Sequence, residues 1–366
     1  MKVLFLSNYR DGTGWAKGAI DYILALDSVG VDLVIRPIKL NNENVEIPQR
    51  LIQLESRDSH GCDIVVQQTL PHLMDYNGNF KKNIGFYASE TASFKSSSWT
   101  NRLNLMDEIW VINEQMVECA RNSGVTRPIK IVSHPMDISK FEKPWPPIPE
   151  IKNWDNGTFI FYTIGEFTRR KNFASIIRAF HTEFDRFEPV SLLIKTSGPQ
   201  EEVIKYCNEI KRGLKMYPDI NQYKQDIIIT DRLTDENIYR LHRSCDVFVT
   251  ASHGEAFSIP CAEAMALGNT PIAPRFGGFL EYLNDLNAWL VDGTMQPVFG
   301  CFDTFQDLFT AKDDWFVVDE RSLQKAMRSA YENKALRDEK AMNGIDRAYD
   351  FTYEKVGQKM KEALGG

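Results

Sequence analysis

Two glutamates stand eight positions apart in the stretch SHGEAFSIPCAEAMALG, which covers residues 252–268. A carboxylate accepts two hydrogen bonds from a vicinal diol, so Glu255 and Glu263 could each hold a sugar ring, one of them a ribose. The spacing by itself is not diagnostic, because three other glutamate pairs share it: Glu142 and Glu150, Glu201 and Glu209, and Glu354 and Glu362. The interpretation therefore depends on the elements around the pair.

Three consecutive cations, Arg169, Arg170 and Lys171, follow Gly165 at a point where a helix is expected to begin. Their charges would add to the positive end of the helix dipole and form a site for a dianion such as a diphosphate. A solvated basic turn is the alternative interpretation of an isolated triplet.

A glycine-rich turn, Gly12-Thr13-Gly14, follows the first apolar run and precedes a helical pattern. Such a turn lets the backbone approach a phosphate or a sugar closely. It does not match the dinucleotide fingerprint, because the third glycine is Gly18 rather than residue 17. An NAD-dependent oxidoreductase or epimerase is therefore a weaker alternative, and a plain tight turn remains open.

These residues must be positioned by strands and helices that alternate through both halves of the chain. Short runs rich in Val, Ile and Phe predict buried parallel strands, and helical patterns such as 171–184 and 235–245 separate them. The pattern predicts an α/β protein with two Rossmann-like domains, whose ligands bind at the carboxyl ends of the strands. The twelve runs are 1–8, 31–38, 63–70, 82–89, 108–113, 128–135, 158–165, 191–197, 226–231, 246–252, 270–275 and 288–293.

A proline-rich segment at 141–157 interrupts both periodicities and predicts a linker. We expect an N-terminal domain at 1–143, a linker at 144–157 and a C-terminal domain at 158–349. The irregular stretch from Val298 to Trp315 predicts a long surface loop, and the chain is mainly helical from Ser322 to its end.

The expected strands and helices place the two glutamates in different environments. Glu255 is expected in the turn after the strand at 246–252, and Glu263 about one turn into the next helix, which Ser258 would cap and Pro260 would start. The free amides of Phe257, Ser258 and Ile259 would face the same crevice. A second close-approach turn, Gly277-Gly278, follows the next strand and precedes a helix.

Composition narrows the function classes. A net charge of −7 over 366 residues argues against a dedicated binder of nucleic acid or of an anionic membrane. The six cysteines form no C-x-x-C pair, so we expect no metal site and reduced thiols in a cytoplasmic compartment. No apolar run approaches the roughly 20 residues that span a bilayer.

Several segments of the chain resemble a known protein family. GEFTRRKNFASIIRAF (165–180) and HGEAFSIPCAEAMALGNTPIAPRFGGFLE (253–281) are similar to the donor-binding half of retaining GT-B glycosyltransferases of the GT4 group, the glycosyl transferases group 1. EIWVINEQMVECARNSGV and IKIVSHPMDISKF resemble the end of that family's first domain. DFTYEKVGQKMKEAL resembles its last helix, about 350–366 here, which crosses back onto the first domain.

The resemblance implies two Rossmann-like domains with a cleft between them. It also implies a metal-independent, cofactor-free hexosyl- or pentosyltransferase that moves a sugar from a nucleotide diphosphate sugar to an acceptor hydroxyl with retention of configuration. A glycan or lipid-linked glycan is the expected acceptor, and a modified nucleic-acid base is an alternative that the net charge does not support. In this family Lys171 would hold the diphosphate, Glu255 would contact the transferred sugar and Glu263 the ribose. Arg169 or Arg170, the amides after Glu255, and the glycines Gly12, Gly14 and Gly165 would complete the donor site.

Three departures qualify this resemblance. Glu166 stands where the family usually has Arg, and Ala256 and Ser258 replace two family glycines. The family's first-domain histidine has no clear match, so Glu90 in YASET is the acceptor-side candidate. These departures leave open a catalytically silent nucleotide-sugar-binding module.

Overall fold

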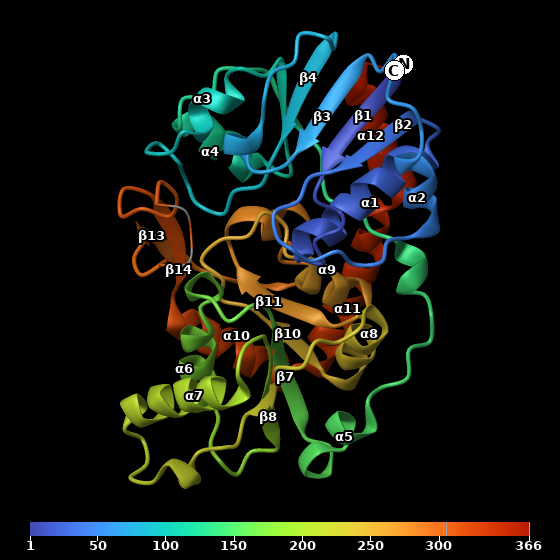
Figure 1. Ribbon diagram of the computed structural model, residues 1–366. Coiled ribbons are helices and arrows are strands. Elements are labelled where there is room, and N and C mark those ends of the chain that lie inside the picture. Colours follow the sequence, from blue (N-terminus) through green and yellow to red (C-terminus); the bar gives the residue numbers. More distant parts are fainter. Residues whose placement is uncertain (303, 305, 366) are drawn as a thin grey trace.

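The computed structural model describes residues 1–302, 304 and 306–365, which form two parallel six-stranded sheets with helices packed on them (Figure 1). All twelve predicted runs form strands. The N-terminal sheet has the order β2-β1-β3-β4-β5-β6, and the C-terminal sheet has the order β12-β11-β10-β7-β8-β9. Their bounds are β1 Lys2–Ser7, β2 Asp32–Pro37, β3 Ile64–Gln68, β4 Lys82–Phe86, β5 Glu108–Val111, β6 Ile129–Ile131, β7 Phe159–Ile164, β8 Val190–Lys195, β9 Ile227–Ile229, β10 Val247–Val249, β11 Thr270–Pro274 and β12 Trp289–Val291.

The strands are apolar because both faces of each sheet are covered. Phe5 of β1 pairs in register with Ile35 of β2 and with Val66 of β3, and all three side chains are fully buried. In the second sheet Phe161 of β7 lies between Leu192 of β8 and Val247 of β10. Continuous burial of this kind is typical of parallel sheets between helical layers.

Some of the helices begin at a residue whose side chain accepts a free amide of the first turn, as in α1, α4, α8, α10 and α12. The hydroxyl of Thr13 accepts from the amide of Ala16 at the start of α1, and Asp319 accepts from Ser322 at the start of α10. The helices are α1 Gly14–Ser28, α2 Gln49–Glu55, α3 Trp99–Leu103, α4 Glu114–Asn122, α5 Pro149–Lys152, α6 Phe173–Glu183, α7 Gln200–Leu214, α8 Asp235–Ser244, α9 Ile259–Ala266, α10 Glu320–Glu332, α11 Lys334–Ala348 and α12 Tyr353–Leu364. Within the described residues, no helix combines the length and the apolar composition needed to cross a membrane.

The last helix returns to the N-terminal half, where α12 packs along α1 (Figure 1). The approach is close at Gly357, where an added Cβ would lie 2.1 Å from the carbonyl oxygen of Ala25. The ammonium of Lys361 donates to the carbonyl of Val29 over 2.9 Å. The chain therefore connects the two halves both through residues 137–158 and through residues 349–352.

The long surface loop expected from Val298 to Trp315 is present, because the described residues between Pro297 and Asp314 lie in no helix or strand, but its ends differ from the expectation. Trp315 lies in a strand, β14 (Asp314–Val318), which pairs antiparallel with β13 (Gly293–Pro297). Val298 is only 1% exposed. Five-residue strands carry too little alternation to be recognised beside polar neighbours. Asp303 and Phe305 of this predicted loop lie outside the described residues, as does Gly366 of the predicted last helix.

Candidate active site

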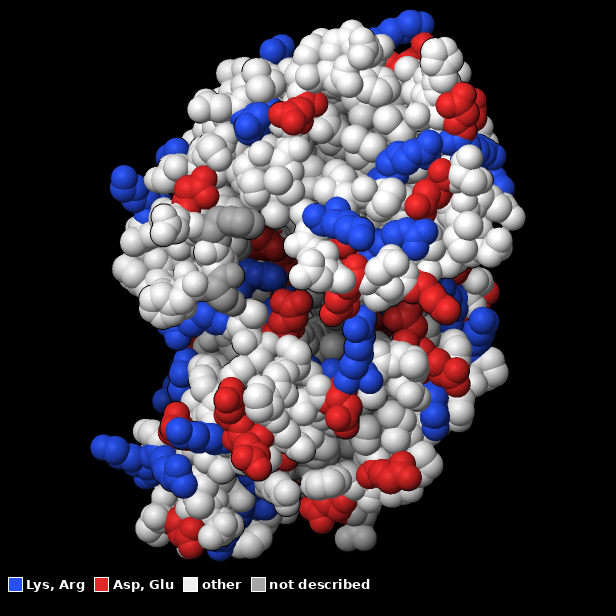
Figure 2. All heavy atoms as spheres, in the orientation of Figure 1, with Lys and Arg blue, Asp and Glu red and all other residues white. Residues whose placement is uncertain are grey.

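The carboxyl ends of the two sheets lie at the cleft between the halves of the molecule, the usual place for ligands in open α/β sheets. Figure 2 shows this region as a hollow with acidic and basic side chains at its edges. The residues singled out by the sequence come from both halves of the chain and gather around this hollow at two carboxylates, Glu255 and Glu263.

Glu255 is held by two cations. Its two oxygens lie 2.6 Å from the ammonium of Lys171 and 3.1 Å from the guanidinium of Arg170. Burial raises the pKa of this carboxyl, but the charges of Lys171 and Arg170 outweigh burial and hold the pKa at about 2. Glu255 is therefore a buried carboxylate, 7% exposed, that stays ionised at neutral pH.

The cations reach Glu255 from a single 3₁₀ turn, Arg169–Lys171, that precedes α6. The cations therefore stand where a helix begins, as expected, but Asn172 adopts a left-handed conformation (φ 50°) between them and Phe173, the first residue of α6. Asn tolerates this conformation better than most residues. Its side-chain amide also donates to the carbonyl of Ala251 over 3.1 Å, which ties the basic turn to the end of β10.

Arg169 and Gly165 have different surroundings from Arg170 and Lys171. Arg169 lies beside Gly300, where an added Cβ would be 3.7 Å from its Nε, and it forms no ion pair among the described residues. Gly165 lies under Lys171, whose Cδ would be 3.3 Å from a Cβ at that position. Glu166 is exposed. The structure thus brings two of the three predicted cations onto Glu255.

Glu90 reaches the same cluster from the N-terminal half. One of its carboxylate oxygens lies 3.8 Å from Arg170. A Cβ at Gly254 would lie 1.7 Å from the carbonyl oxygen of Glu90, so only glycine fits between the two halves at this point. The acceptor-side candidate and the Glu255 turn are therefore in direct contact.

Glu263 occupies the other end of the site. It is 3% exposed on α9, and its Oε1 lies 2.6 Å from the ammonium of Lys17 on α1. Burial raises the pKa of Glu263, but the charge of Lys17 and a hydrogen bond with His242 outweigh it and hold the pKa at about 2. A cavity of about 20 Å³ adjoins these side chains and is also lined by Tyr239. The ordinary alternative, an exposed helical glutamate, does not describe Glu263.

The turn between the two glutamates is shaped differently from the expectation. Ser258 precedes α9 but does not cap it, because its backbone is left-handed (φ 70°, ψ 77°) and its side chain accepts no capping hydrogen bond. Glycine adopts this conformation at the least cost, so a glycine would suit position 258 better than the serine that stands there. The amides of Phe257, Ser258 and Ile259 donate no hydrogen bond to any described residue, so they are free for a ligand. The Phe257 ring itself packs against His134, with ring centroids 4.8 Å apart.

Gly277 and Gly278 pack against the backbone of this turn. The amide of Gly278 donates to the carbonyl of Glu255 over 2.8 Å, and a Cβ at Gly278 would lie 2.1 Å from the carbonyl oxygen of Ala256. The expectation that the pair precedes a helix is wrong in detail, because both residues lie inside the 3₁₀ helix Gly277–Glu281. The glycines are needed for the close approach of two backbones.

The first glycine-rich turn lies at the edge of the cleft. Gly12 has a left-handed backbone (φ 68°), and a Cβ there would lie 2.8 Å from a guanidinium nitrogen of Arg232 in the C-terminal half. Gly14 starts α1, and a Cβ there would meet no atom within 4 Å. The structure thus gives a steric reason for glycine at residue 12 and none at residue 14.

Sequence reasoning missed two parts of the site. Lys17, one turn into α1, is recognisable only as a cation after a glycine-rich turn.

The β13–β14 hairpin touches both halves of the chain. Trp315 stacks on His253 with ring centroids 4.1 Å apart, and the carboxylate of Asp307 accepts from the hydroxyl of Ser97 over 3.0 Å. The carbonyl of Asp314 accepts from the amide of Ala92 over 2.8 Å, so the hairpin connects the segment after Glu90 to the turn before Glu255.

No group of three or more His, Cys, Asp or Glu side chains is placed to hold a metal ion in the part of the chain that the structure describes. The site consists instead of carboxylates paired with lysine and arginine, together with free backbone amides.

Solved structures identify the class of this fold. Anabaena HepE in complex with UDP and glucose is 15% identical, with a TM-score of 0.70 over 100% of this chain and 99% of that chain. Sucrose-phosphate synthase from Thermosynechococcus elongatus is also 15% identical, with a TM-score of 0.66 over 100% and 98%. An E. coli structure described as trehalose-6-phosphate bound with UDP-2-fluoro glucose is 11% identical, with a TM-score of 0.66 over 99% of both chains. The chain therefore has the GT-B fold of glycosyltransferases.

Within this class, residues 146–297 match the family model of the glycosyl transferases group 1. The match covers the basic turn, both glutamates and the Gly277-Gly278 pair. No curated protein matches the chain.

Proposed function

We propose that this protein is a retaining glycosyltransferase that moves a sugar from a nucleotide diphosphate sugar to an acceptor hydroxyl. The observation that carries the proposal is the convergence of Lys171 and Arg170 on Glu255, beside free amides and opposite Glu90, at the carboxyl edge of the sheet in the family-matched segment. A diphosphate leaving group needs cations and N–H donors, and a transferred sugar needs hydrogen-bond acceptors. The site supplies both: the cations come from the 3₁₀ turn Arg169–Lys171, and the carboxylate and the amides come from the turn that precedes α9.

The reaction breaks the bond between the anomeric carbon and the diphosphate oxygen and forms a bond from that carbon to the acceptor oxygen on the same face. Lys171, Arg170 and the amides of Phe257, Ser258 and Ile259 would stabilise the negative charge that develops on the diphosphate. The acceptor proton would pass to a diphosphate oxygen as the leaving group departs. Glu255, ionised at neutral pH, would hold the sugar hydroxyls and favour positive charge on the sugar ring.

Glu263 would hold the ribose of the donor. In the structure this carboxylate is paired with Lys17, and the cavity beside it, about 20 Å³, has room for no more than one water molecule. Donor entry would therefore require the two halves to move apart and Lys17 to shift, as in enzymes whose domains close on their substrates. Transfer would need no metal ion, and Glu90 would face a glycan or lipid-linked glycan acceptor.

The test is titration calorimetry of UDP and UDP-glucose in EDTA, followed by assay of UDP release. We choose UDP because Anabaena HepE is solved with UDP and glucose. We expect Glu263→Gln to weaken UDP binding by about 1–2 kcal/mol, the value of a charge-assisted hydrogen bond. We expect Glu255→Gln to lower kcat by about 10² or more while UDP still binds. The exposed glutamates Glu354 and Glu362, at the same spacing on α12, serve as matched Gln controls and should change neither quantity.

Three results would contradict the proposal. Failure to bind UDP, GDP, ADP or CDP would exclude a nucleotide-sugar site. Binding that is lost in EDTA would exclude metal independence. Binding without UDP release at high enzyme concentration would support the catalytically silent binding module instead.

A further inference from the structure

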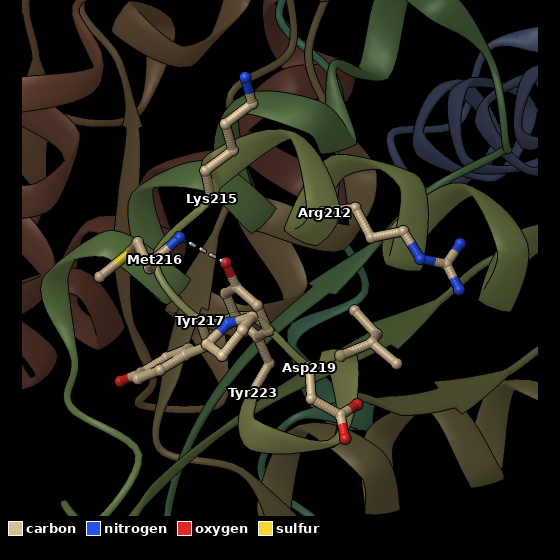
Figure 3. A pocket seen from close by; sticks show the side chains of 8 residues that line it. Arg212, Lys215, Met216, Tyr217, Asp219 and Tyr223 are labelled. Carbon is tan, nitrogen blue, oxygen red and sulfur yellow. Dashed lines mark hydrogen bonds between the residues drawn. The ribbon is translucent and has the colours of Figure 1, made fainter.

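A cavity of about 630 Å³ lies between the last turn of α7 and the segment that leads to β9 (Figure 3). The charged side chains that line it, Arg212, Lys215 and Asp219, point in different directions in Figure 3, so they do not converge on a ligand. The contacts of the β13–β14 hairpin, by contrast, meet at one residue beside the Glu255 turn, His253.

His253 binds the hairpin through both its backbone and its side chain. The amide of Phe316 donates to the carbonyl of His253 over 3.0 Å, and Nδ1 of the imidazole lies 2.8 Å from the carbonyl oxygen of Phe316. Because a carbonyl oxygen only accepts hydrogen bonds, Nδ1 carries the proton and is the donor. The imidazole also stacks on Trp315, with an angle of 22° between the ring planes. The side chain of His253 therefore fixes the hairpin against the segment that precedes Glu255.

The backbone of His253 also holds the basic turn. Its amide donates to the carbonyl of Arg170 over 2.8 Å. The guanidinium of Arg170 donates to the carbonyl of Gly254 over 2.6 Å and lies 3.1 Å from the carboxylate of Glu255. Residues 253–255 therefore fix both the backbone and the side chain of Arg170, and a shift of His253 would move Arg170 relative to Glu255.

The loop between β13 and β14 binds the N-terminal half. The hydroxyl of Ser93 donates to the carboxylate of Asp313 over 3.4 Å, and the amide of Ser98 donates to the carboxylate of Asp307 over 3.1 Å. Both serines belong to the segment 91–98, which directly follows Glu90. The hairpin with its loop therefore connects the segment next to the acceptor-side candidate with His253.

We propose that His253 is a positioning residue for sugar transfer, and that the hairpin makes its position depend on the contact with residues 91–98. This inference rests on the proposed function, because it assigns a role within that reaction. His253 would act through Arg170, which would stabilise the departing diphosphate, and through the turn that carries Glu255. A displacement of about 1 Å in such groups is enough to slow a reaction about 10²-fold. Because Glu263 lies at the other end of the site, a displaced Arg170 should impair turnover more than nucleotide binding.

Substitution of His253 tests this role. His253→Ala removes the hydrogen bond from Nδ1 and the stack on Trp315, whereas His253→Asn keeps an N–H donor for the carbonyl of Phe316. With UDP-glucose as the substrate, we expect His253→Ala to lower kcat for UDP release at least about tenfold. The Kd for UDP, measured by calorimetry, should change by less than about threefold, and His253→Asn should recover at least about half of the wild-type kcat.

His181→Ala is the matched control, because His181 is a buried histidine of the same half whose Nε2 lies 2.8 Å from Asp226, at the amino end of β9. It should lower the unfolding free energy in urea but leave kcat within about twofold of the wild type. If His253→Ala does not fold, His253→Phe, which keeps a ring for Trp315 and loses the donor, replaces it with the same expected loss. An unchanged kcat, no recovery in His253→Asn, or an equal loss of kcat in His181→Ala would overturn the proposal.

The part of the hairpin is tested by combining His253→Ala with Asp307→Ala. Asp307→Ala should lower kcat at least about threefold in the wild-type background and no further in His253→Ala, because coupled residues are not additive. Losses that multiply in the double variant would overturn the connection through the hairpin.

Amide hydrogen exchange gives a readout that does not require activity. His253→Ala should speed the exchange of residues 91–98, although these residues lie in the other half of the chain. Unchanged exchange in this segment would overturn the connection. A wild-type protein that releases no UDP would contradict the proposed function instead, and the exchange rates would still decide whether His253 holds this segment.

Discussion

Replacing Lys17 with Met should destabilise the protein, because it removes the cation that neutralises Glu263 across the two halves. The Glu263 side chain is 5% exposed, and its nearest cation, the Lys17 ammonium, lies 2.6 Å away. Removal of one partner from a buried ion pair costs about 3–5 kcal/mol. The Lys17 side chain is 27% exposed and water screens the pair in part, so we expect a loss of about 2–3 kcal/mol at pH 7.

Urea unfolding followed by circular dichroism measures this loss. The double variant Lys17→Met with Glu263→Gln should recover to within about 1 kcal/mol of the wild type, because it no longer buries an unpaired charge. Lys334→Met breaks an exposed ion pair with Asp338 and should cost less than about 0.5 kcal/mol. A Lys17→Met protein within about 0.5 kcal/mol of the wild type would refute the reasoning. A double variant no more stable than the single one would refute it as well.

Three further predictions concern the same site. Glu255 has a folded-state pKa of about 2 against an ordinary 4.5, so its ionised form stabilises the native state by about 3 kcal/mol above pH 4.5. This stability is lost as the pH falls from about 4.5 to 2. The difference in unfolding free energy between the wild type and Glu255→Gln should therefore disappear over that pH range, and a constant difference would count against the low pKa of Glu255. Ser258→Gly relieves a left-handed backbone and should raise the unfolding free energy by about 1 kcal/mol in urea titration, whereas Ser258→Ala should not. Asp307→Ala removes the hydrogen bond to Ser97, so amide hydrogen exchange of residues 91–98 should become faster. Unchanged exchange rates would show that the contact with the hairpin does not stabilise this segment.

Local patterns were sufficient to predict the fold and the elements on which the two glutamates lie. Runs of Val, Ile and Phe indicated all twelve parallel strands, because a strand buried on both faces is apolar along its whole length. The order of strand, turn and helix then placed Glu255 in a turn and Glu263 on a helix, since ligand residues of α/β sheets follow the carboxyl ends of strands. The missed strands, β13 and β14, are five residues long, and in an antiparallel pair of this size the pattern is too short to distinguish from a loop.

The sequence by itself determined which residues stand at strand ends, because that depends on neighbours a few positions apart. Only the tertiary structure decided which of them meet. Lys17 reaches Glu263 across 246 positions of sequence, and the carbonyl of Glu90 fills the space that a side chain at Gly254 would need. Arg169 lies beside Gly300, although the next two residues, Arg170 and Lys171, bind Glu255. These contacts depend on how two separately formed sheets pack against each other, and the local periodicity of either half carries no information about that packing.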